Sequence, residues 1–261
     1  MTYANLLAEI RGSVAHITIN RPEARNSIDL ATAKELAEVA LSLREDSSVR
    51  AVIITGQGGT FSVGGDVKAF ATEPDLPLYL EKLTTYLHTA ISHFVRMSAP
   101  VITAVNGMAA GAGMSLACIG DLTLAAESAK FVVAYSKIGL TPDGSCSYFL
   151  PRIIGLKKAL ELALTNRMLS AQEALDWGIV TRVIPDAELF SEAEVIAAQL
   201  ASGATRALGV TKQLLHDSWT TALEVQMQHE TTAISDISRT ADAQEGITAF
   251  VEKRPPSFSG R

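Results

Sequence analysis

Short, continuously apolar segments that run into glycine-rich bends occur twice in this chain. Residues 51–55 and 101–105 have the length and composition of strands buried in a covered sheet. Glycine-rich bends follow them near Gly65 and near Ala112, and the second bend leads into a helix. Small residues in such a bend let a ligand approach backbone N–H groups. We therefore expect an α/β protein with a ligand site at these bends.

The remaining pattern places strands first and helices last. Further strands are predicted at residues 6–10, 14–19, 122–126, 131–134 and 180–184. Helices are predicted at residues 30–43, 80–97, 157–164, 171–177, 189–200, 207–216 and 222–237. Residues 71–78, with two prolines among acidic residues, are expected to form a mobile surface loop. We predict an α/β core over residues 1–200 and a C-terminal helical region over residues 201–261.

Composition limits the partners. The net charge of −6 argues against a broad nucleic-acid or anionic-membrane surface. No apolar run is long enough to span a bilayer, and residues 1–5 lack the layout of a secretory signal, so we expect a cytoplasmic protein with no membrane partner. Cys118 and Cys146 are read as reduced thiols. No His/Cys cluster has metal-ligand spacing, so no metal is predicted.

The two bends favour one kind of chemistry. If the fold brings them together, the N–H groups of Gly65 and Ala112 can hold one carbonyl oxygen, an arrangement called an oxyanion hole. Losing one such donor costs about 3–4 kcal/mol of transition-state stabilisation. Asp143 supplies a carboxylate farther along, although Pro142-Asp143-Gly144 is also a strong turn signal by itself. A backbone anion site with one acid or base is sufficient for enolate chemistry on a thioester.

Several motifs together resemble one family. They are Phe61-Ser62-Val63-Gly64-Gly65-Asp66, Asn106-Gly107-Met108-Ala109-Ala110-Gly111-Ala112-Gly113, Ala129-Lys130-Phe131, Leu150-Pro151-Arg152 and Lys253-Arg254-Pro255-Pro256. The combination is similar to the enoyl-CoA hydratase/isomerase (crotonase) superfamily from end to end, and most of all to its ring-epoxide (1,2-epoxyphenylacetyl-CoA) isomerases. The resemblance implies a crotonase-like spiral of ββα units with a C-terminal helical trimerisation region, and hence a homotrimer or a dimer of trimers.

The resemblance also implies roles for individual residues. An acyl-CoA thioester would be the substrate, with no separate cofactor, and its carbonyl would lie between the N–H groups of Gly65 and Ala112. Residues expected beside the substrate are Arg25, Val63, Lys68, Met108, Gly111, Tyr135, Phe149, Phe250 and Lys253. Arg25 and Lys68 would approach the CoA phosphates, and Phe250 and Lys253 would reach the CoA of a neighbouring subunit. Solvated surface charges and helix packing are the alternative interpretations of these four residues.

The reaction depends on residues that differ within the family. Enoyl-CoA hydratases of this family carry two glutamates, at positions that are Ser115 and Tyr135 here, so hydration is disfavoured. Asp143 lies where isomerases of the family carry their essential carboxylate. An apolar wall that includes Met108 and Phe149 is expected to raise its pKa so that it can shuttle a proton.

We therefore predict an acyl-CoA isomerase that shifts a double bond or rearranges an epoxide in an enoyl- or arylacetyl-CoA, and three alternatives to it remain. Asp143 alone could orient a water for hydration of an enoyl-CoA. It could instead act as a nucleophile, as in 4-chlorobenzoyl-CoA dehalogenases, with His88 activating water; His88 could equally be a polar residue on the face of its helix. Finally, the chain could be an acyl-CoA-binding protein without catalysis.

Overall fold

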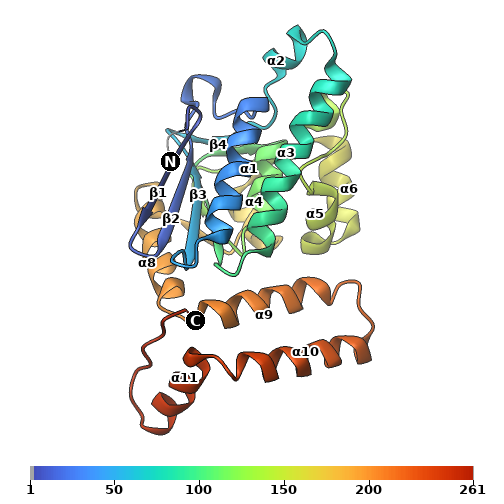
Figure 1. Ribbon diagram of the computed structural model, residues 1–261. Coiled ribbons are helices and arrows are strands. Elements are labelled where there is room, and N and C mark those ends of the chain that lie inside the picture. Colours follow the sequence, from blue (N-terminus) through green and yellow to red (C-terminus); the bar gives the residue numbers. More distant parts are fainter. Residues whose placement is uncertain (1–2, 261) are drawn as a thin grey trace.

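Two sheets form the framework of the protein. The computed structural model describes residues 3–260 (Figure 1). The larger sheet has the order β1-β2-β3-β5-β7-β10. Its strands are β1 Leu6–Arg11, β2 Val14–Ile19, β3 Ala51–Gly56, β5 Val101–Val105, β7 Leu122–Ala126 and β10 Arg182–Ile184. The smaller sheet, in the order β4-β6-β8-β9, consists of β4 Thr60–Ser62, β6 Met108–Ala110, β8 Lys130–Val132 and β9 Leu169–Ser170.

The chain alternates between these sheets as it winds. β3, β5 and β7 lie in the larger sheet, and each is followed at once by a strand of the smaller sheet and then by helices. The helices after β4, β6 and β8 are α2 Val67–Thr72, α3 Leu76–Arg96, α4 Ala112–Cys118, η2 Tyr135–Ile138, α5 Cys146–Ile154 and α6 Leu156–Thr165. The predicted spiral of ββα units is confirmed.

The first hairpin and the first long helix follow directly from the sequence. β1 and β2 pair antiparallel around the turn at Gly12. The Asp29 carboxylate accepts a hydrogen bond from the Thr32 N–H at 2.8 Å and so caps α1 (Leu30–Glu45). Leu36 and Val39 of α1 are fully buried, and each such side chain contributes about 1.5–3 kcal/mol relative to an exposed one.

The predicted loop at residues 71–78 is wrong. α2 extends to Thr72, and α3 already begins at Leu76. Pro77 lies in the first turn of α3, where its missing N–H has no intrahelical partner to lose, and Asp75 caps the helix by accepting from the Leu78 N–H at 3.2 Å. Pro77 was therefore misread as part of a loop, whereas Pro74 does lie in the short connection between α2 and α3.

Two other boundaries differ from expectation. The strand predicted at residues 131–134 ends at Val132, because Ala134 takes the left-handed conformation (φ 63°) that starts η2. Helix α5 was not predicted, and α11 (Ala241–Val251) was not predicted individually, although it lies within the predicted C-terminal helical region. The remaining elements are η1 Pro22–Ala24, α7 Ala171–Asp176, η3 Asp186–Glu188, α8 Leu189–Ala201, α9 Thr205–Asp217 and α10 Leu223–Ile237.

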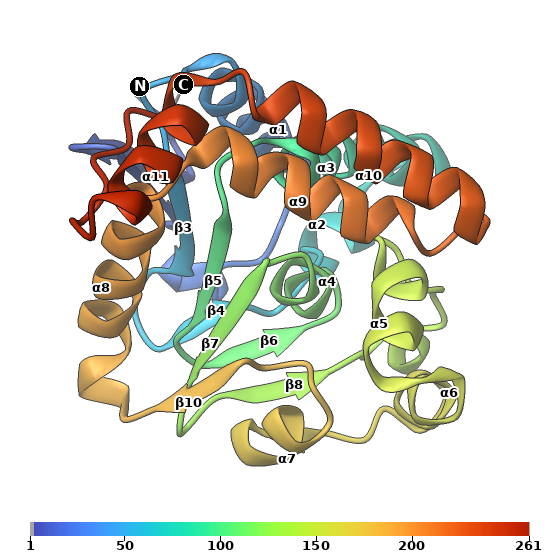
Figure 2. The same cartoon turned by 90° about the horizontal axis from the view of Figure 1, so that it is seen from below.

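The C-terminal helices lie at one end of the spiral. Figures 1 and 2 show α8 beside the larger sheet and α9, α10 and α11 beyond it. Helix α9 is attached to the spiral by Lys212, whose Nζ lies 2.7 Å from Oδ2 of Asp121 and donates to the Phe94 carbonyl. Within residues 3–260, no helix combines the length and hydrophobicity that crossing a membrane requires.

Candidate active site

The site lies where three strands of the smaller sheet end. β4, β6 and β8 run parallel, with Ser62 opposite Ala109 and Ala110 opposite Val132. The residues that follow these strands therefore emerge at the same edge, which is where ligands bind in parallel sheets. Gly65, Ala112 and Tyr135 consequently come together although they are far apart in the sequence.

The two glycine-rich bends are in direct contact. Gly64 has φ +89°, and a Cβ there would lie 3.0 Å from the backbone nitrogen of Ala112. A Cβ on Gly113 would lie only 2.2 Å from the Ser62 carbonyl oxygen, so a side chain would push α4 away from β4. Glycine is needed at both positions for close approach of backbone to backbone.

Backbone hydrogen bonds leave two N–H groups free at this contact. The Ile28 N–H donates to the Gly64 carbonyl, and the Asp66 N–H donates to the Ile28 carbonyl. The carbonyl before Gly65 and the N–H after it are therefore both hydrogen-bonded. Within residues 3–260, the N–H groups of Gly65 and of Ala112, the first residue of α4, donate no hydrogen bond. Two backbone donors at this contact are thus free to bind a ligand.

A cavity of about 400 Å³, the central cavity, adjoins both bends. Most of its lining is apolar, including Val63, Phe70 and Leu83. Gly65, Gly111, Ala112, Tyr135 and Asp143 also line it. Two acidic residues are among the described lining residues, and of these Glu81 is exposed whereas Asp143 is partly buried.

Asp143 lies in an environment suited to holding a proton. Burial raises the pKa of Asp143 above its ordinary value, while the hydrogen bond from Tyr135 and the electrostatic influence of His88 act in the opposite direction. Nearby, burial raises the pKa of the Cys146 thiol to about 11, so this cysteine stays protonated at neutral pH. Cys118 and Cys146 are both free and buried, as predicted.

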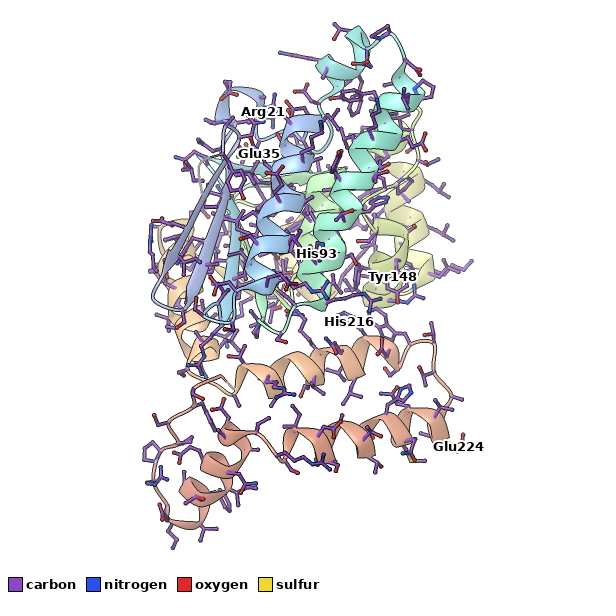
Figure 3. All side chains as sticks on the ribbon, in the orientation of Figure 1. Arg21, Glu35, His93, Tyr148, His216 and Glu224 are labelled. Carbon is purple, nitrogen blue, oxygen red and sulfur yellow. The ribbon has the colours of Figure 1, made fainter. Side chains whose placement is uncertain are left out.

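Asp143 also borders a second cavity of about 520 Å³, the rear cavity, between α3, α5 and α9. His88 and Phe149 line this cavity. Figure 3 labels two more of its lining residues, Tyr148 on α5 and His216 on α9, which lie near each other where the two helices meet. Phe149 and Asp143 therefore share the rear cavity, whereas Phe149 is not among the described residues that line the central cavity.

A third space of about 690 Å³, the outer hollow, has basic residues in its lining. Arg25 and Lys68 both line it, and both side chains are exposed. Val63 and Gly65 line the outer hollow and the central cavity alike, so the two spaces adjoin. A ligand seated at the bends would therefore extend toward these two cations.

Some predicted site residues lie elsewhere. Met108 is the first residue of β6 and lies opposite Thr60 and Lys130. It is not among the described residues that line the central cavity, the rear cavity or the outer hollow. The expectation that it borders Asp143 is wrong, because the site lies at the C-terminal end of β6 and Met108 is the first residue of that strand. Phe250 lies on α11 and Lys253 just after it, and both are exposed. Neither is among the described residues of this chain that line the three spaces.

Sequence reasoning missed two supports of the site. One is Arg21, which donates a hydrogen bond to Asp66, the residue directly after Gly65. The other is the pair Ser115 and Tyr135, which contact Asp143 through hydrogen bonds. An arginine in a polar loop and two hydroxyls on separate elements carry no local signal of such contacts. For the part of the chain described, no group of three or more His, Cys, Asp and Glu residues is placed to hold a metal ion.

The sequence and the fold match known proteins. The family model for enoyl-CoA hydratase/isomerase matches residues 9–261. The 1,2-epoxyphenylacetyl-CoA isomerase of Escherichia coli (strain K12) is 37% identical, over 98% of both chains. A probable enoyl-CoA hydratase of Rhodobacter capsulatus is 36% identical over the full length of both. The crystal structure of an enoyl-CoA hydratase from Bacillus anthracis superposes with a TM-score of 0.93 at 32% identity, covering 99% of this chain and 100% of that one.

These similarities and the geometry above define an α/β enzyme of the crotonase fold, in which two backbone N–H groups without a partner among the described residues lie where parallel strands end. The chain belongs to the enoyl-CoA hydratase/isomerase family, which acts on acyl-CoA thioesters. Relatives at nearly equal identity carry the names of different reactions, so the reaction has to be argued from the site itself.

Proposed function

We propose that this protein is an acyl-CoA isomerase that shifts a double bond or rearranges an epoxide in an enoyl- or arylacetyl-CoA. One observation carries the proposal. A partly buried carboxylate with a raised pKa, Asp143, lines the same cavity as the two unpartnered N–H groups of Gly65 and Ala112. An acid/base and an oxyanion site facing one small apolar space are what enolate chemistry requires.

The reaction follows from these groups. The thioester carbonyl accepts hydrogen bonds from the N–H groups of Gly65 and Ala112. The Asp143 carboxylate removes a proton from the carbon chain, and negative charge moves to the carbonyl oxygen, where the two N–H groups stabilise it. The protonated Asp143 then returns the proton at a different carbon, and no water is consumed. The raised pKa of Asp143 makes both transfers accessible near neutral pH.

Hydration is the first alternative. It requires groups that hold and activate a water molecule beside the double bond. Ser115 and Tyr135 are both buried, and their hydroxyls are already hydrogen-bonded to each other and to Asp143. Asp143 would have to orient the water alone, which disfavours this reaction.

A dehalogenase-like hydrolysis is the second alternative, because it needs a histidine to activate water. His88 Nε2 accepts a hydrogen bond from the Gly144 N–H at 3.1 Å, which occupies the lone pair that a base would use. His88 also lines the rear cavity, not the central cavity where the backbone donors lie. Both facts favour the isomerase.

The rest of the ligand fits the outer hollow. Arg25 and Lys68 line it and are exposed, so we assign them to the phosphates of CoA. Phe250 is exposed on α11 and Lys253 follows that helix; a trimer, or a dimer of trimers, would bring these residues to a neighbouring subunit's CoA. No separate cofactor is part of the proposal.

A substrate panel tests the proposed reaction. Purified protein is incubated with enoyl-CoA, epoxyarylacetyl-CoA and halobenzoyl-CoA thioesters, and the products are identified by mass spectrometry and NMR. Isomerised product of unchanged mass is expected. A gain of one water would indicate hydration, loss of halide would indicate dehalogenation, and binding without turnover would indicate a non-catalytic protein.

The matched variant is Asp143→Asn, which keeps the shape of the side chain and removes its proton chemistry. It should lower kcat roughly 10²–10⁴-fold, the usual contribution of a general acid/base. Binding of a saturated acyl-CoA, measured by calorimetry, should stay close to that of the unmodified protein. Substantial isomerase activity in this variant would contradict the assignment.

A further inference from the structure

We propose that Tyr135 and Ser115 are positioning residues that hold the Asp143 carboxyl group in its reactive orientation. The inference rests on the proposed function, because it explains how a single carboxylate can serve as both base and acid. It gives a positive role to the two hydroxyl residues that disfavour hydration.

Tyr135 fixes the side chain of Asp143. It is the first residue of η2 and is only 9% exposed. Its phenol donates a hydrogen bond to Oδ1 of Asp143. Burial, together with the neighbouring carboxylate, raises the pKa of Tyr135 far above its ordinary value, so the phenol keeps its proton and remains a donor at every working pH.

The same ring connects the carboxylate to the second bend. A Cβ on Gly111 would lie 4.0 Å from the Tyr135 ring carbon that bears the hydroxyl. The phenol is therefore packed beside the residue that precedes Ala112. Because Tyr135 occupies Oδ1, the proton of the substrate would go to Oδ2.

Ser115 fixes the backbone of Asp143. It is fully buried on α4, and its hydroxyl lies 3.0 Å from the Asp143 carbonyl oxygen and 3.1 Å from the Tyr135 hydroxyl. The Gly111 carbonyl oxygen lies 3.4 Å away, so the one serine proton has three possible acceptors, of which the Asp143 carbonyl is the nearest. A Cβ on Gly144 would lie 2.9 Å from the Ser115 Cβ, so the peptide after Asp143 packs directly on this serine.

His88 holds the other end of that peptide. The Gly144 N–H donates to His88 Nε2, while the Asp143 carbonyl accepts from Ser115. Both polar groups of one peptide unit are therefore held by side chains from two helices, α3 and α4. A carboxylate on a turn held in this way keeps its direction when substrate binds, which preserves the geometry of proton transfer.

The arrangement predicts a particular pH signature. The hydrogen bond from Tyr135 lowers the pKa of Asp143 against the opposing effect of burial, so removing the phenol hydroxyl raises that pKa. The other titratable groups that face Asp143 are His88 from α3 and Cys146 from α5. Charged or titratable residues that share its two cavities are Glu81, Lys137, Arg96, Tyr148, His216 and Asp217. All of them are kept in the variants below.

The test compares Tyr135→Phe with Tyr86→Phe, which removes a phenol exposed on the outer face of α3. In Tyr135→Phe, kcat should fall roughly 10- to 100-fold, as expected for the loss of a hydrogen bond to a charged group, with KM little changed. The acid limb of its pH–rate profile should move to higher pH. Tyr86→Phe should leave both quantities unchanged. A role in packing alone would not move the acid limb.

A second readout does not depend on turnover. The carboxyl carbon of Asp143 is labelled with ¹³C and titrated by NMR, with Asp143→Asn identifying the signal. Its midpoint should be higher in Tyr135→Phe than in the unmodified protein, and an unchanged midpoint would overturn the inference. If no substrate is isomerised and the midpoint still moves, the proposed function fails while the support of Asp143 stands.

Ser115→Ala completes the comparison. It should lower kcat by itself, and the double variant Ser115→Ala/Tyr135→Phe should lose less than the product of the two single effects, because both residues act through Asp143. Independent, multiplicative losses would show that Ser115 does not act through this contact.

Discussion

The guanidinium of Arg21 lies 3.0 Å from Oδ2 of Asp66 and so ties the loop after β2 to the bend that carries Gly65. The same group lies 3.2 Å from Oδ2 of Asp29 and donates to the Ser27 carbonyl at 2.7 Å. Figure 3 shows Arg21 near the start of α1, in the part of the molecule where these segments meet. The position of one proposed oxyanion donor therefore depends on a side chain from another segment.

Replacing this arginine tests that dependence. Arg21 and Asp66 have side chains only 16% and 13% exposed, and breaking one partner of a buried pair costs about 3 kcal/mol. Arg21→Gln should lose roughly that much free energy of unfolding in urea titrations, and kcat should fall because Gly65 is less well held. Arg167→Gln is the control, since its pairs with Glu161 and Glu173 are exposed and should matter little. Equal losses in the two variants would contradict this account.

The second donor can be removed without changing a side-chain function. Ala112 is the first residue of α4, a position that tolerates proline because its N–H has no partner within the helix. Ala112→Pro should lower kcat roughly 10²–10³-fold, as the loss of one oxyanion donor does. Steady-state kinetics measure this effect, and circular dichroism checks the fold.

Ala241→Pro is the matched control, at the exposed first position of α11. It should leave both kcat and the circular dichroism spectrum unchanged. Full activity in Ala112→Pro would remove Ala112 from the proposed oxyanion hole.

Lys68 offers a test of the phosphate site. It is exposed on α2 and lines the outer hollow. Lys68→Ala should raise KM for an acyl-CoA roughly ten-fold, the loss expected for one charge-assisted contact, with kcat nearly unchanged. The same variant should show no defect with an acyl-pantetheine, which lacks the phosphates. Lys157→Ala, a change at an exposed lysine on α6, should behave like the unmodified protein with both substrates.

The raised pKa of Asp143 has a consequence for stability. A carboxyl group whose folded-state pKa lies above its ordinary value of 3.8 destabilises the fold progressively as pH rises from that value through the raised pKa. Asp143→Asn cannot ionise, so its melting temperature relative to the unmodified protein should increase across this window and stay higher at neutral pH. Calorimetric scans at pH 3 to 8 measure the difference. A constant difference at every pH would show that Asp143 ionises normally.

The sequence by itself determined the local parts. Apolar runs identified β3 and β5, and Asp29 marked the cap of α1, because these features depend on neighbours in the chain. The glycine-rich bends and the Asp143 turn were also readable as local patterns. Pro77 was misleading at the start of α3, because a proline is read as a break unless the start of the helix is known.

Only the tertiary structure decided how these parts meet. The parallel pairing of β4, β6 and β8 brings Gly65, Ala112 and Tyr135 to one edge, and packing of α4 sets Ser115 against the Asp143 peptide. The same pairing leaves Met108 outside the site. Strand register and helix packing are set by contacts between residues far apart in sequence, and a local pattern contains no record of which distant groups will become neighbours.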